Sequence, residues 1–211
     1  MKPAVVIVDM LEDNYGDRSD KKREEERIVR PVRDFLRVCR SLSVPVIFAC
    51  DSFLEGDFIF GGRMKPHAIR GTAGARVLDD LEPQPSDIVL PKRRFSAFFK
   101  TDLDQTLRTW NIDTVAVGGI ATYFCVLATA FDAVCHDFHT VILEDLCAAY
   151  KKEIHDNALS AYRHSAIHPL LRVATSSEFI GQLRGVPGGQ GDSLGSGEWH
   201  ATGHGNALRS R

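Results

Sequence analysis

The sequence lacks a long hydrophobic run. The first apolar stretch covers only residues 4–8 before Asp9, which is too short for a signal peptide or a membrane span. An excess of charge of one sign is also missing, since 26 Lys and Arg stand against 28 Asp and Glu for a net charge of −2. No nucleic acid and no anionic membrane is therefore expected as a partner. We expect a cytoplasmic protein.

Paired cysteine motifs are absent as well. The five cysteines are an odd number, contain no Cys-x-x-Cys pair and lie within apolar segments, which argues against a disulfide or zinc framework. The chain has no internal repeat and no phosphate-cradling glycine loop that ends in Gly-Lys-Ser or Gly-Lys-Thr. At 211 residues it is long enough for one domain with a sizeable core.

Apolar periodicity is missing from the C-terminal residues 185–211. This stretch is rich in Gly and Ser, and it cannot bury enough apolar surface to offset the entropy lost on ordering. We therefore expect one folded domain over residues 1–184 and a disordered tail over residues 185–211. The tail histidines, His200 and His204, are not expected to have a function there.

Six short apolar segments have the length and composition of buried parallel strands. Amphipathic segments separate them, and in one of these, Pro31 predicts either a kink or a helix that begins near Arg30. Strands alternating with helices indicate an α/β fold, a three-layer doubly wound sheet that is mostly parallel, with the expected strand order 3-2-1-4-5-6. The expected strands are residues 4–9, 45–50, 87–90, 114–117, 140–143 and 171–175, and the expected helices are residues 28–39, 74–81, 101–110, 155–164, 177–183 and the helix that carries Cys125.

Chemically active side chains follow the ends of the first four predicted strands. In chain order they are Asp9, Asp51, Lys92 and Cys125. Ligands of doubly wound sheets bind beyond the carboxyl ends of the strands, so we expect these side chains to share one site.

A glycine turn leads into the helix that carries Cys125. The strand passes through Gly118 and Gly119, and the apolar helix then begins with Cys125 on its first turn. The positive end of the helix dipole favours a thiolate there, which predicts a lowered pKa for this thiol. The alternative is that Cys125 is a small buried hydrophobic residue behind a tight turn.

Three segments together resemble a known family. Residues 119–133, GIATYFCVLATAFDA, are similar to the nucleophile segment of the isochorismatase-like cysteine hydrolases, the superfamily that includes nicotinamidases and related amidases. Asp9 in AVVIVDM and Lys92 in IVLPKRRFSAFFKTDLD stand where this family carries its Asp and Lys. The resemblance covers residues 2–183 and leaves out the tail.

The resemblance implies a role for each of these residues. Cys125 would attack a carbonyl carbon and form a thioester, while Asp9 would take the thiol proton and pass it to the leaving amine. Lys92 would supply positive charge beside both groups. The backbone N–H groups of Ala121 and Cys125 would form the oxyanion hole, and the Ile120–Ala121 peptide bond would be cis.

The role of Lys92 rests mainly on the resemblance. Its strand lies two places from that of Asp9 in the expected order, and a surface lysine in a Lys-Arg-Arg cluster is the alternative.

The substrate pocket is predicted less directly. Residues 52–73 form a long irregular loop rich in Gly and Phe, and structureless loops of this length in compact domains are usually functional. An aromatic lining suits a planar substrate, although each aromatic ring alone can simply cover the core. The candidate substrate-binding residues are Phe53, His67, Phe98 and Tyr123, with Phe58, Phe60, Phe95, Ser96, Thr122 and Asp145 as further candidates.

The metal ligands of nicotinamidases are only partly present. Those enzymes carry an Asp-x-His pair after strand two and further histidines in the loop, whereas this chain has Asp51 followed by Ser52 and Phe53. Asp51 and His67 remain, and Asp57 or Glu55 would have to supply a third ligand. We therefore expect no bound metal and no cofactor.

The sequence thus predicts a cysteine-dependent hydrolase that cleaves a C–N bond of a small amide or ureido compound through a thioester. One alternative is an isochorismatase-type hydrolase that cleaves a vinyl ether. Another is a non-catalytic thiol-redox or binding module on the same fold. Assembly into a homo-oligomer stays open.

Overall fold

A computed structural model of the chain describes residues 1–15 and 24–185. The tail expected over residues 185–211 lies outside the described residues, apart from Gly185. Within the described residues, no helix combines the length and the apolar character needed to cross a bilayer.

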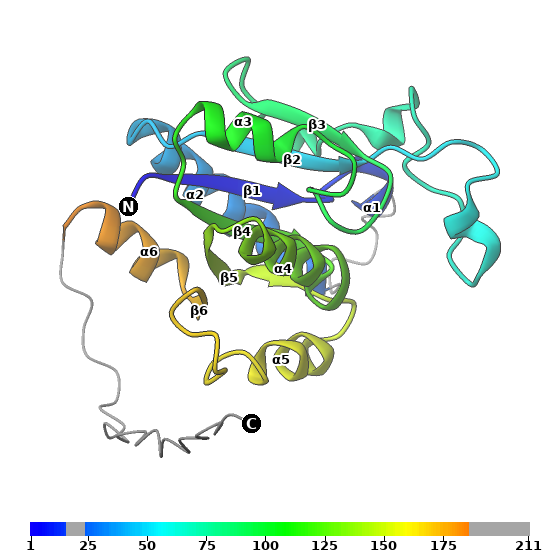
Figure 1. Cartoon of the computed structure of the whole chain (residues 1–211). Helices are drawn as coiled ribbons and strands as arrows, with labels where there is room; N and C mark the ends of the chain where they lie inside the picture. Colours follow the sequence, from blue (N-terminus) through cyan, green and yellow to red (C-terminus); the bar gives the residue numbers. More distant parts are fainter. Residues whose placement is uncertain (16–23, 186–211) are drawn as a thin grey trace, which may run out of the picture.

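Six parallel strands form one sheet at the centre of the molecule (Figure 1). Their order is β3-β2-β1-β4-β5-β6, as predicted, and every neighbouring pair is parallel. The central strand β1 is buried along its whole length, which explains its nearly continuous run of Val and Ile. The strands are β1 (Pro3–Val8), β2 (Val46–Asp51), β3 (Ile88–Lys92), β4 (Thr114–Ile120), β5 (His139–Ala148) and β6 (Leu171–Ala174).

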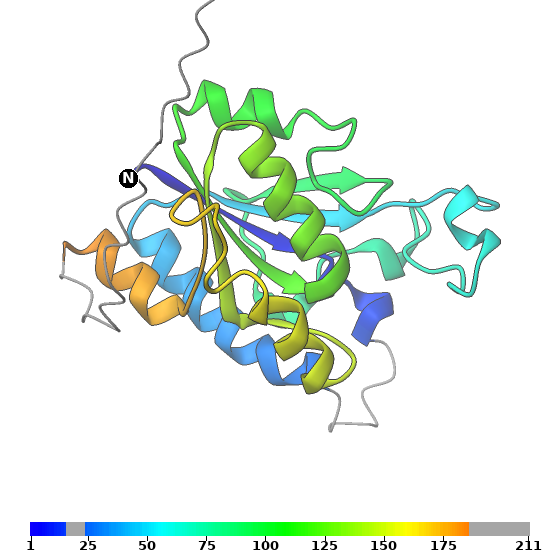
Figure 2. The same cartoon turned by 60° about the horizontal axis from the view of Figure 1, so that its bottom comes forward.

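Helices cover both faces of the sheet and create two hydrophobic cores. Helices α2 (Val29–Ser41) and α6 (Ser176–Leu183) pack on one face. Helices α3 (Leu103–Thr109), α4 (Leu127–Cys135) and α5 (Lys152–Ser160) contribute to the core of the other face. Figure 2 shows α2 and α6 together below the sheet and α3 and α4 above it. Alternate residues of β1 belong to opposite cores, as the two-residue period of a strand requires.

The segment before α2 confirms one of the two readings of Pro31. A 3₁₀ helix (Glu24–Ile28) precedes α2, and the α-helix itself begins at Val29, so Pro31 lies in its first turn. Proline is tolerated there because the first backbone N–H groups of a helix have no partner within the helix.

The prediction of a helix over residues 74–81 is wrong. The chain forms two short 3₁₀ turns there, Ala73–Ala75 and Asp79–Leu81. Backbone groups of this segment bond instead to the chain after β1, where the short helix α1 (Glu12–Tyr15) lies: the N–H of Glu12 donates to the carbonyl of Arg76, and that of Leu78 donates to Met10. Tertiary hydrogen bonds therefore replace the internal bonds of a helix.

Strand β5 extends beyond its predicted end at residue 143. It continues to Ala148, with a register shift opposite Val117 and Gly119 of β4. Asp145 therefore lies inside the strand, and its carboxylate accepts hydrogen bonds from the N–H and the hydroxyl of Ser176 at the start of α6. Its role in the structure is to hold α6.

Candidate active site

Four buried side chains meet at the carboxyl edge of the sheet. Asp9 follows β1, Asp51 and Lys92 are the last residues of β2 and β3, and Cys125 lies just after β4. Each of the four residues is at most 7% exposed. The four side chains therefore lie together, as their places at the strand ends predicted, and three of them are ionisable as charged groups.

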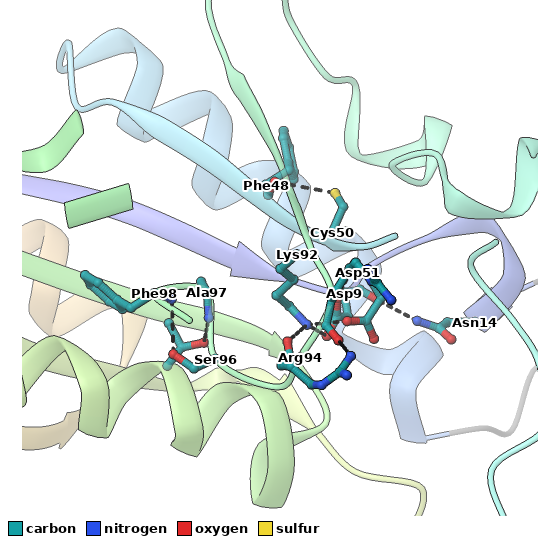
Figure 3. Close-up of polar contacts among 12 residues, drawn as sticks. Asp9, Asn14, Phe48, Cys50, Asp51, Lys92, Arg94, Ser96, Ala97 and Phe98 are labelled. Atoms are coloured by element: carbon teal, nitrogen blue, oxygen red, sulfur yellow. Dashed lines mark hydrogen bonds and ion pairs between the residues drawn. The ribbon is translucent and has the colours of Figure 1, made fainter. Parts of the chain in front are cut away.

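Lys92 joins the two carboxylates. Its ammonium Nζ lies 2.7 Å from Oδ2 of Asp9 and 2.6 Å from Oδ1 of Asp51, and it also donates to the carbonyl of Arg94 at 3.2 Å. Figure 3 shows Lys92, Asp9 and Asp51 turned towards one another. Lys92 is paired in register with Asp51, so its long side chain passes the end of β2 and reaches Asp9 on the next strand. It is not a surface lysine.

Asp9 is held from several sides. Its backbone adopts a positive φ of 52°, a conformation that Asp tolerates better than most residues. Its Oδ1 accepts the backbone N–H of Asp51 at 2.8 Å, and its carbonyl accepts the side-chain amide of Asn14 at 2.7 Å. With Lys92 on the other carboxylate oxygen, the carboxylate has one fixed orientation.

The local backbone before and around Cys125 is unusual. The Ile120–Ala121 peptide bond is cis, and residues Thr122–Val126 form a short π-helix that leads into α4. Cys125 therefore lies in this π-helical turn and not in the first turn of a regular α-helix. Its Sγ and carboxylate oxygens of Asp9 and Asp51 lie within 4.8 Å of one another.

The predicted lowering of the Cys125 pKa is wrong. Burial raises the pKa of this thiol well above its usual value, and the negative charge of Asp9 raises it further, while Lys92 partly opposes the effect. Desolvation and the neighbouring carboxylates disfavour the thiolate more than the nearby ammonium favours it. The resting group is therefore a thiol.

The charged groups shift one another as well. Burial raises the pKa of Asp51 to about 7, the charge of Asp9 raises it too, and Lys92 opposes both. Burial alone would lower the pKa of Lys92, but the charges of Asp9, Cys125 and Asp51 outweigh burial and raise it. Lys92 therefore stays an ammonium across the physiological pH range.

A buried hydrogen bond fixes the turn that carries Cys125. Thr122 is fully buried, and its Oγ1 lies 2.8 Å from Nδ1 of His155, which is 6% exposed and belongs to α5. This contact ties the π-helix to the neighbouring helix. Thr122 thus supports the turn.

We expect Thr122→Val to destabilise the protein by about 1–3 kcal/mol, because it leaves the buried ring nitrogen of His155 without this partner. Urea unfolding measures the effect. The matched control is Thr109→Val, since the hydroxyl of Thr109 donates to the carbonyl of Gln105 on an exposed part of α3; it should change stability by less than about 0.5 kcal/mol. Equal effects for the two variants would contradict this role of Thr122.

A cavity of about 150 Å³ opens beside the cluster of Asp9, Asp51 and Cys125. Aromatic rings form much of its wall: Phe95 and Phe124 stack with centroids 5.5 Å apart, and Phe53 contacts His67 at 5.5 Å. The structure therefore places the predicted residues Phe53 and His67 at this cavity. Its lining is Asp9, Asn14, Asp51, Phe53, Met64, His67, Phe95, Ile120, Ala121, Phe124 and Cys125.

Two other predicted substrate-binding residues do not line this cavity. Phe98 is 7% exposed, stacks on His136 at 5.0 Å and belongs to the core on the side of α3 and α4. Tyr123 lies against Phe124 at 4.3 Å and faces Tyr150. Phe98 and Tyr123 were expected at the pocket because they lie close to Lys92 and Cys125 in the chain. Their own side chains do not line the cavity.

Sequence reasoning missed Asn14, Met64 and Phe124 in the lining. Asn14 lies only five residues after Asp9, and a polar residue so close to a strand-end carboxylate was a usable signal. Nothing in the sequence pattern distinguished Met64 within the long loop.

The residues near Asp51 do not fit a zinc-type metal site. Asp51 gives one oxygen to Lys92, Nδ1 of His67 lies 2.9 Å from the carbonyl of Lys65, and Asp57 is paired with Arg93 and Arg94. A closed or catalytic zinc site needs at least three protein ligands. Asp9, Asp51 and Cys125 also lie close together, but the ammonium of Lys92 already occupies the position between the carboxylates.

We expect any catalytic activity to survive dialysis against a strong chelator, because the side chains near Asp51 do not provide three available zinc ligands. Elemental analysis of the purified protein should show far less than one transition metal per chain. A stoichiometric metal that is lost together with activity on chelation would contradict the expectation.

Comparisons with known proteins identify similar chains. The isochorismatase domain family matches residues 3–175. The isochorismatase family protein PncA of Bacillus subtilis is 32% identical over an alignment of 182 positions that covers 78% of this chain and 96% of that protein. The ureidoacrylate amidohydrolase RutB of Pantoea ananatis is 31% identical over an alignment of 138 positions that covers 56% of this chain and 55% of that relative, so the match spans about half of its length. The structure of N-carbamoylsarcosine amidase from Thermoplasma acidophilum has a TM-score of 0.71 and 31% identity, covering 84% of this chain and 98% of that one.

Proposed function

The chain belongs to the isochorismatase family, and we propose that it is an amidohydrolase in which Cys125 cleaves the C–N bond of a small amide or ureido compound. The observation that carries the proposal is the buried Cys125 thiol beside the oriented carboxylate of Asp9, which Lys92 holds at 2.7 Å. A nucleophile, a proton acceptor and a group that orients the acceptor are the three parts that nucleophilic catalysis needs.

The first half of the proposed reaction forms a thioester. Asp9 takes the thiol proton as Sγ of Cys125 attacks the carbonyl carbon, and the carbonyl oxygen becomes an oxyanion. The backbone N–H groups of Ala121 and Cys125 donate to this oxygen. Asp9 then gives the proton to the leaving nitrogen, the C–N bond breaks, and ammonia or an amine departs.

The second half consumes water. Asp9, again a carboxylate, takes a proton from a water molecule that attacks the thioester carbon. The C–S bond breaks, the acid product leaves, and the proton returns to the thiol. The sum of both halves is amide plus water to carboxylic acid plus ammonia or amine.

The raised pKa of Cys125 supports this division of roles. A buried thiol that is protonated at neutral pH needs a base at the moment of attack, and Asp9 is the carboxylate positioned to act. Lys92 keeps two neighbouring carboxylates from repelling each other and prevents Asp9 from turning away. It is therefore a positioning residue for the proton transfer.

The wall of the cavity and the relatives support the substrate class. A cavity of about 150 Å³ with stacked rings on its wall suits a small planar group such as an amide or a urea. Two similar proteins are named for ureido or carbamoyl substrates, ureidoacrylate and N-carbamoylsarcosine.

The two alternative functions are less favoured by the geometry. Cleavage of a vinyl ether requires no thiol nucleophile, whereas this site pairs a thiol with a base. A redox-sensing cysteine has a low pKa and is accessible to solvent, whereas Cys125 is buried and its pKa is raised.

The decisive experiment is an ammonia-release assay on a panel of primary amides, carbamoyl compounds and ureido acids. We expect at least one member to be hydrolysed, and Cys125→Ala to abolish the reaction. Cys135→Ala is the matched control, because Cys135 is an exposed cysteine at the end of α4; it should keep full activity. Ammonia release that persists in Cys125→Ala would refute the proposal, and so would turnover of vinyl ethers alone.

A further inference from the structure

A second cavity, of about 350 Å³, lies at the end of β3. Four cationic side chains line it together with Pro91 and Phe99: Arg70, Arg93, Arg94 and Lys100. The chain as a whole has a net charge of −2, so this concentration of positive charge is local. The substrate cavity described above shares none of these lining residues.

One carboxylate opposes these four charges. Nε and Nη2 of Arg93 donate to Oδ2 of Asp57 at 3.0 Å and 2.7 Å, and Nη1 of Arg94 donates to its Oδ1 at 3.2 Å. The side chain of Asp57 is only 2% exposed, so it lies beneath the two arginines. It holds their guanidinium groups in place.

The other two cations have no acidic partner within residues 1–15 and 24–185. Nε of Arg70 donates to the hydroxyl of Ser52 at 3.1 Å, and the ammonium of Lys100 lies 5.5 Å from the ring centroid of Phe99. Four positive charges against one negative charge leave a net charge of about +3 at this hollow. Clustered charge of one sign in a concave surface raises the local concentration of ions of opposite sign.

We propose that this cavity binds a small oxyanion that carries two or more negative charges. Guanidinium N–H groups match the oxygens of carboxylate and phosphate groups, and the two arginines here, which Asp57 orients, each keep N–H groups that do not donate to Asp57. Pro91 and Phe99 offer an apolar surface to the rest of such a ligand. Both a polycarboxylate and a phosphate ester or pyrophosphate have the required chemistry.

The cavity is connected to the catalytic cluster through hydrogen bonds. The backbone carbonyl of Arg94 accepts a hydrogen bond from the ammonium of Lys92. The hydroxyl of Ser52, which accepts from Arg70, belongs to the residue directly after Asp51. Figure 3 shows Arg94 next to Lys92. A bound oxyanion therefore touches residues that are in contact with the proposed catalytic groups, without occupying the substrate cavity.

Isothermal titration calorimetry on the full chain tests the proposal, with pyrophosphate and citrate in separate arms at constant ionic strength. We expect at least one of the two to bind saturably at one site per chain with a Kd below about 1 mM. The double variant Arg70→Gln with Lys100→Gln should weaken that binding at least tenfold. The charge-retaining variant Arg70→Lys with Lys100→Arg should bind within a few-fold of the natural protein.

A matched control removes two exposed cations elsewhere, Arg108→Gln with Lys152→Gln, whose side chains are 51% and 66% exposed. It should leave the affinity unchanged. Binding of pyrophosphate alone identifies a phosphate site, binding of citrate alone a carboxylate site, and binding of both a general polyanion site. No saturable binding in either arm, or equal loss in the control and the test variant, would overturn the proposal.

Discussion

Lys92→Met is expected to destabilise the protein by about 3–5 kcal/mol, since it removes the only cation that contacts two buried carboxylates in the described part of the chain. Methionine has nearly the length of lysine, so little packing is lost and the effect is mainly electrostatic. Asp9 and Asp51 are 3% and 7% exposed and have little access to water that could replace the ammonium. Urea unfolding at pH 8 measures the loss.

The sign of the pH dependence follows from Asp51. Its pKa in the folded protein is raised to about 7, so the folded state binds this proton more tightly than the unfolded state. Asp51 therefore lowers the free energy of unfolding progressively as the pH rises from about 4 to about 7, and this loss of stability is reversed as the pH falls. Removal of Lys92 strengthens this effect, and the deficit of Lys92→Met should be smaller at pH 5 than at pH 8.

Two controls separate electrostatics from packing. Lys152→Met, at an ammonium that is 66% exposed, should change stability by less than about 0.5 kcal/mol. Lys92→Met combined with Asp51→Asn should recover part of the loss, because one of the unpaired charges is gone. A deficit that is the same at both pH values and in the double variant would contradict this account.

Gly119→Ala is expected to lower the free energy of unfolding by more than about 4 kcal/mol or to prevent folding, because an added Cβ would collide with backbone atoms. A Cβ at this position would lie 2.1 Å from the carbonyl oxygen and 2.6 Å from the nitrogen of Val8, and φ is +111°. Val8 is the register partner of Gly119 on β1 and directly precedes Asp9. Any shift that relieves the collision must move Asp9, the proposed base, or the turn that carries Cys125, the proposed nucleophile.

Gly181→Ala is the matched control for this substitution. Gly181 lies within α6, nothing lies within 4 Å of an added Cβ, and alanine has the higher helix propensity. It should leave stability unchanged or raise it by up to about 1 kcal/mol. Urea unfolding of both variants is the measurement, and a loss below about 1 kcal/mol for Gly119→Ala would contradict the prediction.

The sheet was predictable because buried parallel strands are short, nearly continuous apolar runs. β1 and β2 are buried at every position, and their runs of Val, Ile, Phe and Ala stand out from the polar segments around them. The shared site followed from the same pattern, since residues at the ends of parallel strands meet at one edge. The prediction of a helix over residues 74–81 failed because tertiary hydrogen bonds to the chain after β1 determine the conformation of this segment.

Features that depend on burial were not predictable from the sequence. Strand order alone argued against a contact between Lys92 and Asp9. The lysine side chain at the end of β3 is nevertheless long enough to pass the end of β2 and contact Asp9. The pKa of Cys125 was expected to fall because the helix end is visible in the sequence. Desolvation, which raises it, depends on the packing of the whole site.

The sheet order also divides the proposed catalytic groups between two halves of the molecule. The base, the second carboxylate and the ammonium all come from β1, β2 and β3, which are adjacent in space and come first in the chain. The nucleophile follows β4, which joins that half along β1. During synthesis, a chain that has reached α3 already contains every charged partner and still lacks the thiol. Among the four groups, the cysteine is thus the last to leave the ribosome.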